Sequence, residues 1–322
     1  MEHSGRFYAK ILLLGEYGVI MGSRALTIPF THFMGELSNL NEEKYTDNAF
    51  ALESNRQLAQ YLEWLKSKPE AARYLDLQKF EEDISQGLYF ECTIPQGYGI
   101  GSSGALVAAL WQRYNTEILP DGKPTAETIL YLKQKFALLE SYFHGTSSGI
   151  DPLIALLKTP LHIKSPGLIE PTGIPRQQYE GPAAIFLLDA GKVGKTHHYV
   201  NLFMNKCEEP TYLQHIKNTY IPLINEGIDN LLAGRQAGFL QNIAAISAFQ
   251  AQHFSEMIPD EIREVWQLGL SSDLYKLKLC GSGGGGFTLG FTTDYARTEK
   301  LLKNNGFSLV PVFQHKQLTG KQ

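Results

Sequence analysis

The pattern of apolar positions predicts strands in both halves of the chain. The runs 7–14 and 24–37 are typical of an early pair of strands, and the alternation in 87–95 is typical of a third. Further strands are expected over 183–190 and on either side of the glycine run 281–286. Strands and helices follow one another without a steady βαβ rhythm, so the expected fold class is α+β rather than a doubly wound sheet.

Helical patterns predict the elements between these strands. Residues 105–114 combine strong helix formers with the spacing of a buried helix. A longer helix is expected over 124–144, closed by Gly145. Asp151 directly precedes Pro152, a pairing typical of a helix start with a capping side chain and a proline in the first turn.

Chain length and a shift in composition predict two domains. The 322 residues exceed the roughly 250 to 300 at which a single core stops growing. Proline and glycine gather in 164–182, which predicts the boundary there. We therefore expect an N-terminal domain over 1–175 and a C-terminal domain over 176–322.

Composition and charge narrow the function classes. With 43% hydrophobic and 19% charged residues, the chain has the composition of an ordinary globular protein. A net charge of -4 and a pI near 6.2 give no basic field for a nucleic acid or an anionic membrane, so neither partner is expected. The three cysteines form no C-x-x-C pair, and no leader or long apolar stretch is present, so a cytoplasmic protein is predicted. A homodimer is one candidate assembly.

Two glycine patterns suggest a dinucleotide-binding turn, but their contexts argue against it. Residues 99–104 read G-x-G-x-x-G. In a dinucleotide-binding fold, an acidic residue about 20 positions further on should end a second strand. Here the acidic residues at that distance, Asp121 and Glu127, lie in a predicted turn and a predicted helix instead. The second match, 281–286, is followed by a strand where a helix should begin. A dehydrogenase is therefore disfavoured.

A third glycine pattern, "DAGKVGKT" at 189–196, resembles a P-loop except at its first position. Asp189 stands there in place of glycine, and its carboxylate would repel a bound phosphate. A surface turn is the favoured interpretation of this segment.

The loop before residue 105 remains as a candidate anion site. Its glycines allow close approach of the backbone, Ser102 and Ser103 offer hydroxyls, and the following helix directs free N–H groups to the same place. This suits a phosphate chain. The alternative is that the glycines serve only a strand-to-helix turn.

Three segments together resemble the signature motifs of the GHMP kinases, a family that includes galactokinase, homoserine kinase, mevalonate kinase and phosphomevalonate kinase. They are "KILLLGEYGVIMGSRAL" from Lys10, "PQGYGIGSSGALVAAL" from Pro95 and "KLCGSGGGGFTLGF" from Lys278. The resemblance implies an α+β phosphate-loop domain followed by a ferredoxin-like domain, with an active site in the cleft between them. It also implies ATP and magnesium as cofactors and a small-molecule alcohol as the substrate.

Within the family, "ESYFHGTSSGID" at 140–151 is similar to the mevalonate kinase pattern. Tyr17 follows Glu16 where mevalonate kinases usually have histidine, and Gly104 follows two serines where they usually have alanine. Both variants resemble phosphomevalonate kinases. Mevalonate is the favoured acceptor, while phosphomevalonate, a sugar and an amino-acid alcohol stay open.

The resemblance also implies roles for individual residues. Asp151 would accept or orient the substrate hydroxyl proton beside Lys10, and Ser103 and Glu140 would hold magnesium, which prefers oxygen ligands. The ATP-binding residues implied are Pro95, Gly97, Gly99, Ile100, Gly101, Ser102 and Ser103. The substrate-binding residues implied are Glu16, Thr196 and Gly283.

Each role has a plainer alternative. Asp151 could be only a helix cap, Lys10 could lie along a strand edge, and Glu140 could be a solvated helix residue. His144 shares a helical face with Glu140, but magnesium disfavours imidazole, so we expect a supporting histidine rather than a ligand. The roles of His197 and His198 stay open.

A catalytically silent GHMP-like ligand sensor is the alternative from another class of protein. A sensor has no need of a proton acceptor, so the joint presence of Lys10, Glu140 and Asp151 argues for an enzyme.

Overall fold

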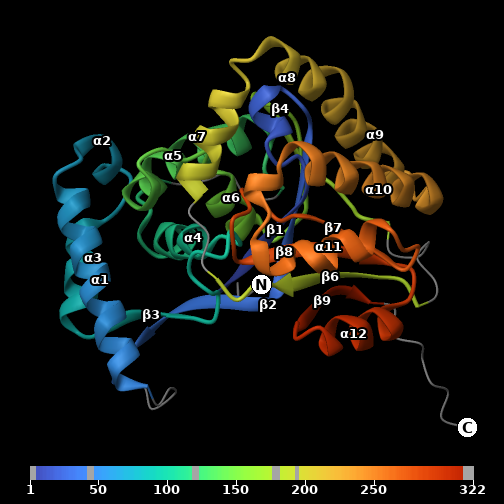
Figure 1. The fold of residues 1–322 in the computed structure, drawn as a ribbon. Helices are drawn as coiled ribbons and strands as arrows, with labels where there is room; N and C mark the ends of the chain where they lie inside the picture. The colour runs from blue at the N-terminus through green and yellow to red at the C-terminus, as the bar shows by residue number, and fades with distance from the viewer. Residues whose placement is uncertain (1–4, 42–46, 118–122, 176–181, 193–195, 315–322) are drawn as a thin grey trace, which may run out of the picture.

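The N-terminal half is built around a five-stranded antiparallel sheet. The computed structural model describes residues 5–41, 47–117, 123–175, 182–192 and 196–314. The strands of this sheet are β1 (Arg6–Leu14), β2 (Ala25–Asn39), β3 (Leu88–Cys92), β4 (Leu161–Ser165) and β5 (Leu168–Pro171). Their order is β1-β2-β4-β5, and β3 pairs with the far end of β2. The long β2 therefore pairs with three of the other strands, β1, β3 and β4 (Figure 1).

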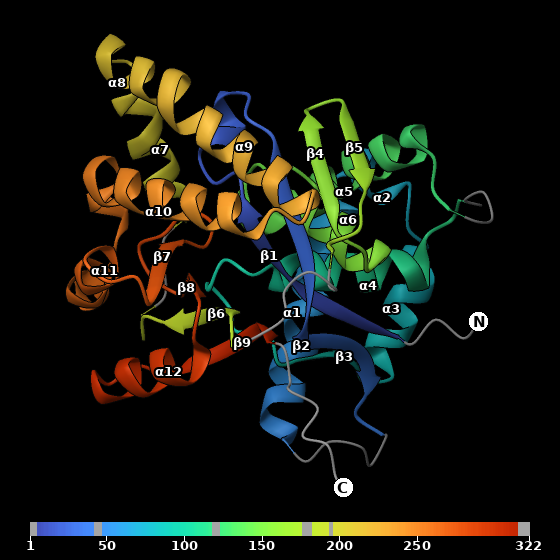
Figure 2. The same cartoon turned by 90° about the vertical axis from the view of Figure 1, so that its right-hand side faces the viewer.

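The C-terminal half contains a four-stranded antiparallel sheet. Its strands are β6 (Ala184–Asp189), β7 (Tyr275–Leu279), β8 (Phe287–Thr292) and β9 (Leu309–Gln314). They lie in the order β7-β8-β6-β9, with helices between β6 and β7 and between β8 and β9. This is the ferredoxin-like arrangement that was predicted, and α12 (Tyr295–Asn304) lies along its lower side in Figure 2.

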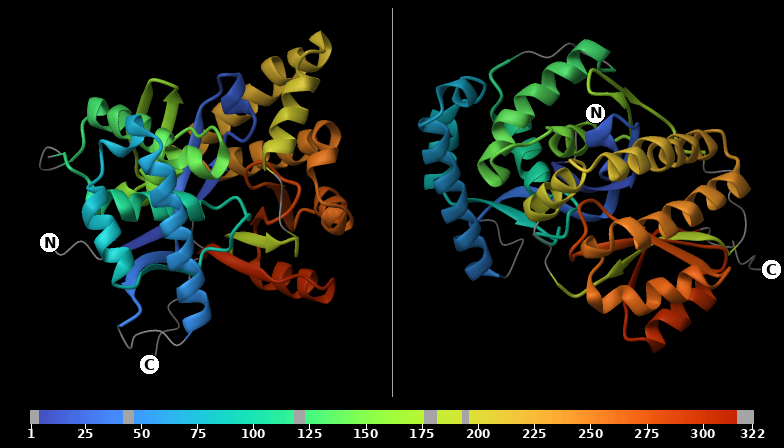
Figure 3. Two further views of the ribbon diagram at one scale, coloured as in Figure 1. Left: turned by 90° about the vertical axis from the view of Figure 1, so that its left-hand side faces the viewer. Right: turned by 45° about the horizontal axis from the view of Figure 1, so that its top comes forward.

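The helices of the N-terminal half fall into two groups. The outer group, at the left edge of the molecule in Figure 1 and in the right view of Figure 3, comprises α1 (Asn48–Lys66), α2 (Pro69–Ala72) and α3 (Leu77–Ser85). The inner group comprises α4 (Ser102–Tyr114), α5 (Ala126–His144) and α6 (Ile150–Leu157). Buried apolar side chains hold both groups together, with the Trp111 and Phe136 rings 5.3 Å apart between α4 and α5. The predicted helices at 105–114 and 124–144 are confirmed, with small shifts of their ends.

The helices of the C-terminal half cover one side of its sheet and reach across to the first sheet. They are α7 (Thr196–Lys206), α8 (Pro210–His215), a π-helical turn (Ile216–Tyr220), α9 (Ile221–Leu232), α10 (Gln236–His253) and α11 (Arg263–Leu270). Helices α10 and α11 pack on β7, whereas α9 packs on α10 and also on β1 and β2. Figure 3 shows α9 lying between the two halves.

The composition of 164–182 suggested a linker, but part of this stretch belongs to the first sheet. Strands β4 and β5 form a hairpin with Ile163 opposite Ile169, so the first sheet continues to Pro171. Pro166 and Gly167 form the turn of this hairpin. The change of sheet falls between Pro171 and Ala184, and the division into domains at 175 stays a prediction.

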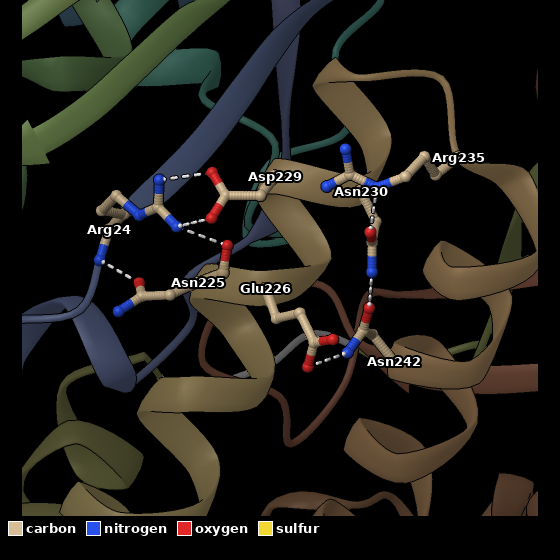
Figure 4. A network of polar contacts seen from close by, with 7 residues as sticks. All are labelled: Arg24, Asn225, Glu226, Asp229, Asn230, Arg235 and Asn242. Atoms are coloured by element: carbon tan, nitrogen blue, oxygen red, sulfur yellow. Dashed lines mark hydrogen bonds and ion pairs between the residues drawn. The ribbon is translucent and has the colours of Figure 1, made fainter.

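Polar contacts on α9 join the two halves of the molecule (Figure 4). Arg24, just before β2, donates to both carboxylate oxygens of Asp229 on α9, each at 2.7 Å. Its backbone N–H donates to Asn225 Oδ1 at 2.9 Å. On the other side of α9, Asn230 donates to Asn242 of α10 at 2.7 Å. The contacts fix α9 against both the first sheet and α10.

Candidate active site

The predicted phosphate loop connects β3 to α4 in a conformation that depends on glycine. Gly97, Gly99 and Gly101 have φ angles of 76°, 74° and 83°, a region that other residues seldom adopt. Gly101 is the N-cap of α4, and no side chain caps this helix end. The N–H groups of its first turn can therefore bind an anion. The Lys10 backbone N–H donates to the Ile100 carbonyl at 2.9 Å and ties the loop to β1.

The glycine run 281–286 joins β7 to β8 and lies directly against this loop. A Cβ atom at Gly286 would stand 2.7 Å from Tyr98 Cα, and one at Gly99 would stand 3.4 Å from the Cys280 carbonyl oxygen. Larger residues would push the two segments apart. The run thus brings backbone of the second half against this loop, while Gly283 itself packs against the Met257 carbonyl. A contact of Gly283 with the substrate stays a prediction.

Lys10 and Asp151 form an ion pair beside the loop. Lys10 Nζ lies 3.2 Å from Asp151 Oδ1, and the side chains are 13% and 28% exposed. A Cβ at Gly101 would stand 3.1 Å from Lys10 Cγ and 3.4 Å from Asp151 Oδ2. The structure thus brings both predicted catalytic residues to the end of the phosphate loop.

Asp151 is not the cap of α6. The N-cap is Gly149, with a φ of 73°, and Asp151 lies within the first turn of the helix. The prediction of Asp151 as a possible capping residue is wrong because the left-handed Gly149 starts the helix two residues earlier. The Asp151 carboxylate is therefore directed to Lys10 rather than to the helix's own N–H groups.

Ser103 and Glu140 also meet, as predicted for a metal site. Ser103 Oγ donates to Glu140 Oε1 at 3.0 Å, and Ser147 Oγ donates to Glu140 Oε2. His144 Nε2 lies 2.9 Å from Ser103 Oγ, so the histidine supports the serine from the same helical face as Glu140. Ser147, which the sequence did not single out as a site residue, also accepts from the Gly149 N–H at 3.0 Å. It links the carboxylate to the start of α6.

The charges of the Lys10–Asp151 pair and of Glu140 shift one another's pKa values. Burial raises the pKa of Glu140 to about 7, with a further contribution from the negative charge of Asp151. Burial lowers the pKa of Lys10, but the charge and hydrogen bond of Asp151 outweigh it and leave the pKa above its usual value. Partial burial lowers the pKa of His144. At neutral pH the site thus holds a cationic Lys10 and a Glu140 that a divalent cation would help to ionise.

The donor set fits magnesium. A buried carboxylate and a serine hydroxyl lie side by side, and Glu140 shares the site with a second carboxylate. Magnesium prefers such oxygen ligands and keeps several waters, so few protein groups are required. No group of three or more His, Cys, Asp or Glu side chains with metal-binding geometry occurs in the described part of the chain. Nucleotide phosphates would complete this coordination.

The other two predicted substrate-binding residues are Glu16 and Thr196. The Glu16 carboxylate is buried and pairs with Lys278 Nζ at 2.9 Å, away from solvent. Thr196 begins α7, but its side chain and those of residues 193–195 lie outside the described residues. Both substrate contacts stay predictions.

The structure describes the P-loop-like segment only in part, because residues 193–195 lie outside the described residues. Asp189 at the end of β6 accepts a hydrogen bond from the Gly191 N–H at 2.8 Å, a turn stabilised by its own carboxylate. The favoured surface turn therefore agrees with residues 189–192 and stays a prediction for the rest of the segment.

A cavity of about 620 Å³ lies apart from these residues. It is lined by residues 28–32 of β2, residues 158–160 after α6, and residues 311–313 of β9, among others. None of the predicted site residues lines it. It begins where α6 ends, whereas Asp151 lies where α6 begins.

The chain has the fold of the GHMP kinases, as comparison with solved structures shows. The glycine loop, the Lys10–Asp151 pair and the Ser103–Glu140 pair gather around the start of α4. The sequence matches no protein-family model and no curated protein. None of the helices that the structure describes is both long and apolar enough to cross a membrane.

Particular solved structures resemble this chain over nearly its whole length. L. major mevalonate kinase in complex with R-mevalonate has 17% identity and a TM-score of 0.64, and the match covers 98% of this chain and 97% of that one. Streptococcus pneumoniae phosphomevalonate kinase, in complex with phosphomevalonate and AMPPNP, has 15% identity and a TM-score of 0.62, with 95% and 97% covered. Lactococcus lactis galactokinase complexed with galactose has 14% identity and a TM-score of 0.61, with 97% and 94% covered.

Proposed function

We propose that this chain is an ATP- and magnesium-dependent kinase that phosphorylates the primary hydroxyl of mevalonate. One observation carries the proposal: the Lys10–Asp151 ion pair and the Ser103–Glu140 pair flank the same uncapped helix start. Phosphoryl transfer needs this combination of anion cradle, metal ligands and proton acceptor.

Each group has a defined task in the proposed reaction. Backbone N–H groups of residues 97–103 hold the nucleotide phosphates, and Ser103 and Glu140 hold the metal. When bound, ATP supplies the transferable phosphoryl group and magnesium neutralises charge on its oxygens. Asp151 accepts the hydroxyl proton of the acceptor, and Lys10 keeps Asp151 ionised and stabilises the charge that develops.

Mevalonate is favoured among acceptors by the 140–151 segment, in which Glu140, His144 and Asp151 follow in the mevalonate kinase order. Phosphomevalonate is the second candidate. Tyr17 and Gly104 favour it, because both depart from the mevalonate kinase pattern in the same direction.

A coupled assay of ADP release tests the proposal. It would compare mevalonate, phosphomevalonate, homoserine and galactose at saturating Mg-ATP, with an Asp151→Asn variant as the inactive control. We expect the highest kcat/KM with mevalonate. A preference for phosphomevalonate would establish the second candidate, and ADP release with galactose alone would overturn both. Nucleotide binding without ADP release from any acceptor would overturn the enzyme proposal and favour a ligand sensor.

A further inference from the structure

A buried ion pair joins the two halves of the molecule behind the proposed site. Lys278 Nζ on β7 lies 2.9 Å from Oε1 of Glu16, which follows β1. The side chains are 0% and 1% exposed, so both charges are removed from water. None of the tasks in the proposed reaction uses this pair.

The pair fixes the peptide that leads into the glycine run. Gln250 of α10 donates to Glu16 Oε1 at 2.6 Å and accepts from the Leu279 N–H at 2.8 Å. Lys278 Nζ donates to the Leu279 carbonyl at 2.7 Å. Both polar groups of Leu279 are thereby held, and the residue after it is Cys280.

Cys280 and the glycine run after it lie against the phosphate loop. The Cys280 carbonyl approaches Gly99 so closely that a Cβ there would stand 3.4 Å away. Tyr17, beside Glu16 in sequence, donates from its hydroxyl to the Ser282 carbonyl. Tyr17 has a φ of 59°, which few residues other than glycine adopt. Residues 16–17 of the first half thus hold residues 278–282 of the second half at two points.

Stability alone does not account for this pair. Burying two charges has a large desolvation cost, and well-packed apolar residues are often as stable in such places. Glu16 Oε2, moreover, has no hydrogen-bond partner among the described residues. A costly and incompletely satisfied ion pair next to a candidate site indicates a geometric role.

We propose that Glu16 and Lys278 are positioning residues that set the glycine run against the phosphate loop. For its catalytic consequence the inference rests on the proposed kinase function. It gives Glu16 a task that does not involve contact with the acceptor: together with Lys278 it fixes Leu279 and Cys280, which in turn limit the position of Gly99.

The test uses Glu16→Gln, Lys278→Met and the double variant. Each single variant leaves one buried charge without its partner, so we expect kcat/KM for ATP to fall about tenfold or more. Because the residues act through one contact, the double variant should lose no more than the worse single variant. The KM for the acceptor should stay within about twofold of wild type throughout.

A direct contact between Glu16 and the acceptor makes the opposite prediction. In that case Glu16→Gln would raise the acceptor KM, Lys278→Met would not, and the losses would multiply in the double variant. That outcome would overturn the positioning role.

Amide hydrogen exchange of residues 95–101 provides a readout that needs no acceptor. We expect exchange in this loop to accelerate about tenfold in both single variants and to stay unchanged in Asp229→Asn, which alters an exposed contact between the halves. If no acceptor is phosphorylated by the wild type but the exchange result holds, the proposed function fails and the positioning role stands. Unchanged exchange in folded single variants would overturn the inference.

Folding is checked by circular dichroism and thermal melts. Gln250→Met is a milder variant for the case in which a charge variant does not fold, because it releases the Leu279 N–H without exposing a charge. It should accelerate the same loop exchange, and unchanged exchange would again contradict the positioning role.

Discussion

Gly104 on α4 leaves room for Asp151 on α6: a Cβ atom at position 104 would stand 2.7 Å from Asp151 Cβ and 2.7 Å from its backbone carbonyl carbon. The two helices therefore approach at this point as closely as a glycine permits. The approach brings the Asp151 carboxylate beside Lys10 and next to the start of α4. Gly104 is one of the two residues at which this chain departs from the mevalonate kinase pattern. It thus lies directly against Asp151, the proposed proton acceptor.

A Gly104→Ala variant tests this close approach. Alanine is the better helix former by about 1 kcal/mol, so without a clash it would stabilise α4. Because the added methyl group meets backbone, we expect instead a lower melting temperature and a kcat reduced about tenfold or more. The matched control is Gly227→Ala in α9, where the new Cβ would stand 3.3 Å from the Leu14 Cδ1 atom and a side chain can yield. Equal effects of the two substitutions would contradict the prediction.

Asp151→Asn tests the proton acceptor. Asparagine keeps the shape of the side chain but cannot take a proton, so turnover should fall by about 10² to 10⁴ while the Kd for Mg-ADP changes little. Pre-steady-state phosphoryl transfer and nucleotide titration measure the two quantities separately. Asp229→Asn is the matched control, because it neutralises an aspartate in an ion pair away from the site. Turnover within tenfold of wild type would remove Asp151 from the mechanism.

The sequence predicted those parts of the site that local pattern determines. Glycines at 97, 99 and 101 before a helix predict a phosphate loop because the left-handed backbone is a local property. The family resemblance predicted Ser103 and Glu140 as ligands of one magnesium ion, and their side chains lie 3.0 Å apart. Their role as metal ligands stays a prediction. The Asp-Pro pattern was ambiguous, since a cap and a first-turn carboxylate look the same in sequence. Only the fold showed that Gly149 starts the helix.

Contacts that depend on distant pairing could not be predicted. Lys278 alternates with apolar residues in β7, a pattern that normally places a lysine on the solvent side of a strand. Its partner Glu16 follows β1, far earlier in the chain, so nothing local in the sequence links the two residues. The hairpin of β4 and β5 was missed for a similar reason, because strand pairing with β2 outweighed the local proline and glycine content.

Glu140 makes the stability of the metal-free protein depend on pH. Its pKa rises from 4.5 to about 7 on folding, so the folded state binds the proton more tightly than the unfolded state. The free energy of unfolding should therefore fall as pH rises from about 4.5 to 7, by about 2–3 kcal/mol from this group. Glu140→Gln mimics the protonated form and should be more stable than wild type by that amount at pH 8, with no difference near pH 4. Urea unfolding without magnesium at both pH values measures this.

Magnesium provides the control for the Glu140 prediction. Under the proposed function the ion binds only the folded protein, so adding it at pH 8 should stabilise wild type and leave Glu140→Gln unchanged. Binding should also release a proton and strengthen between pH 6 and 8, which calorimetry in buffers of different ionisation enthalpy detects. A Glu140→Gln variant less stable than wild type at pH 8 would show that the carboxylate is stabilising and not strained.

A His144→Ala variant tests whether the imidazole of His144 is a metal ligand. Its Nε2 atom contacts Ser103 Oγ at 2.9 Å, and burial lowers its pKa, so the neutral ring can exchange a hydrogen bond with the serine. If it only orients Ser103, His144→Ala should raise the magnesium concentration needed for half-maximal rate by about three- to tenfold, the effect of one hydrogen bond. Ser103→Ala, which also removes a proposed direct ligand, should have the larger effect. A loss of more than a thousandfold in His144→Ala, or activity with zinc replacing magnesium, would instead assign the histidine to the metal itself.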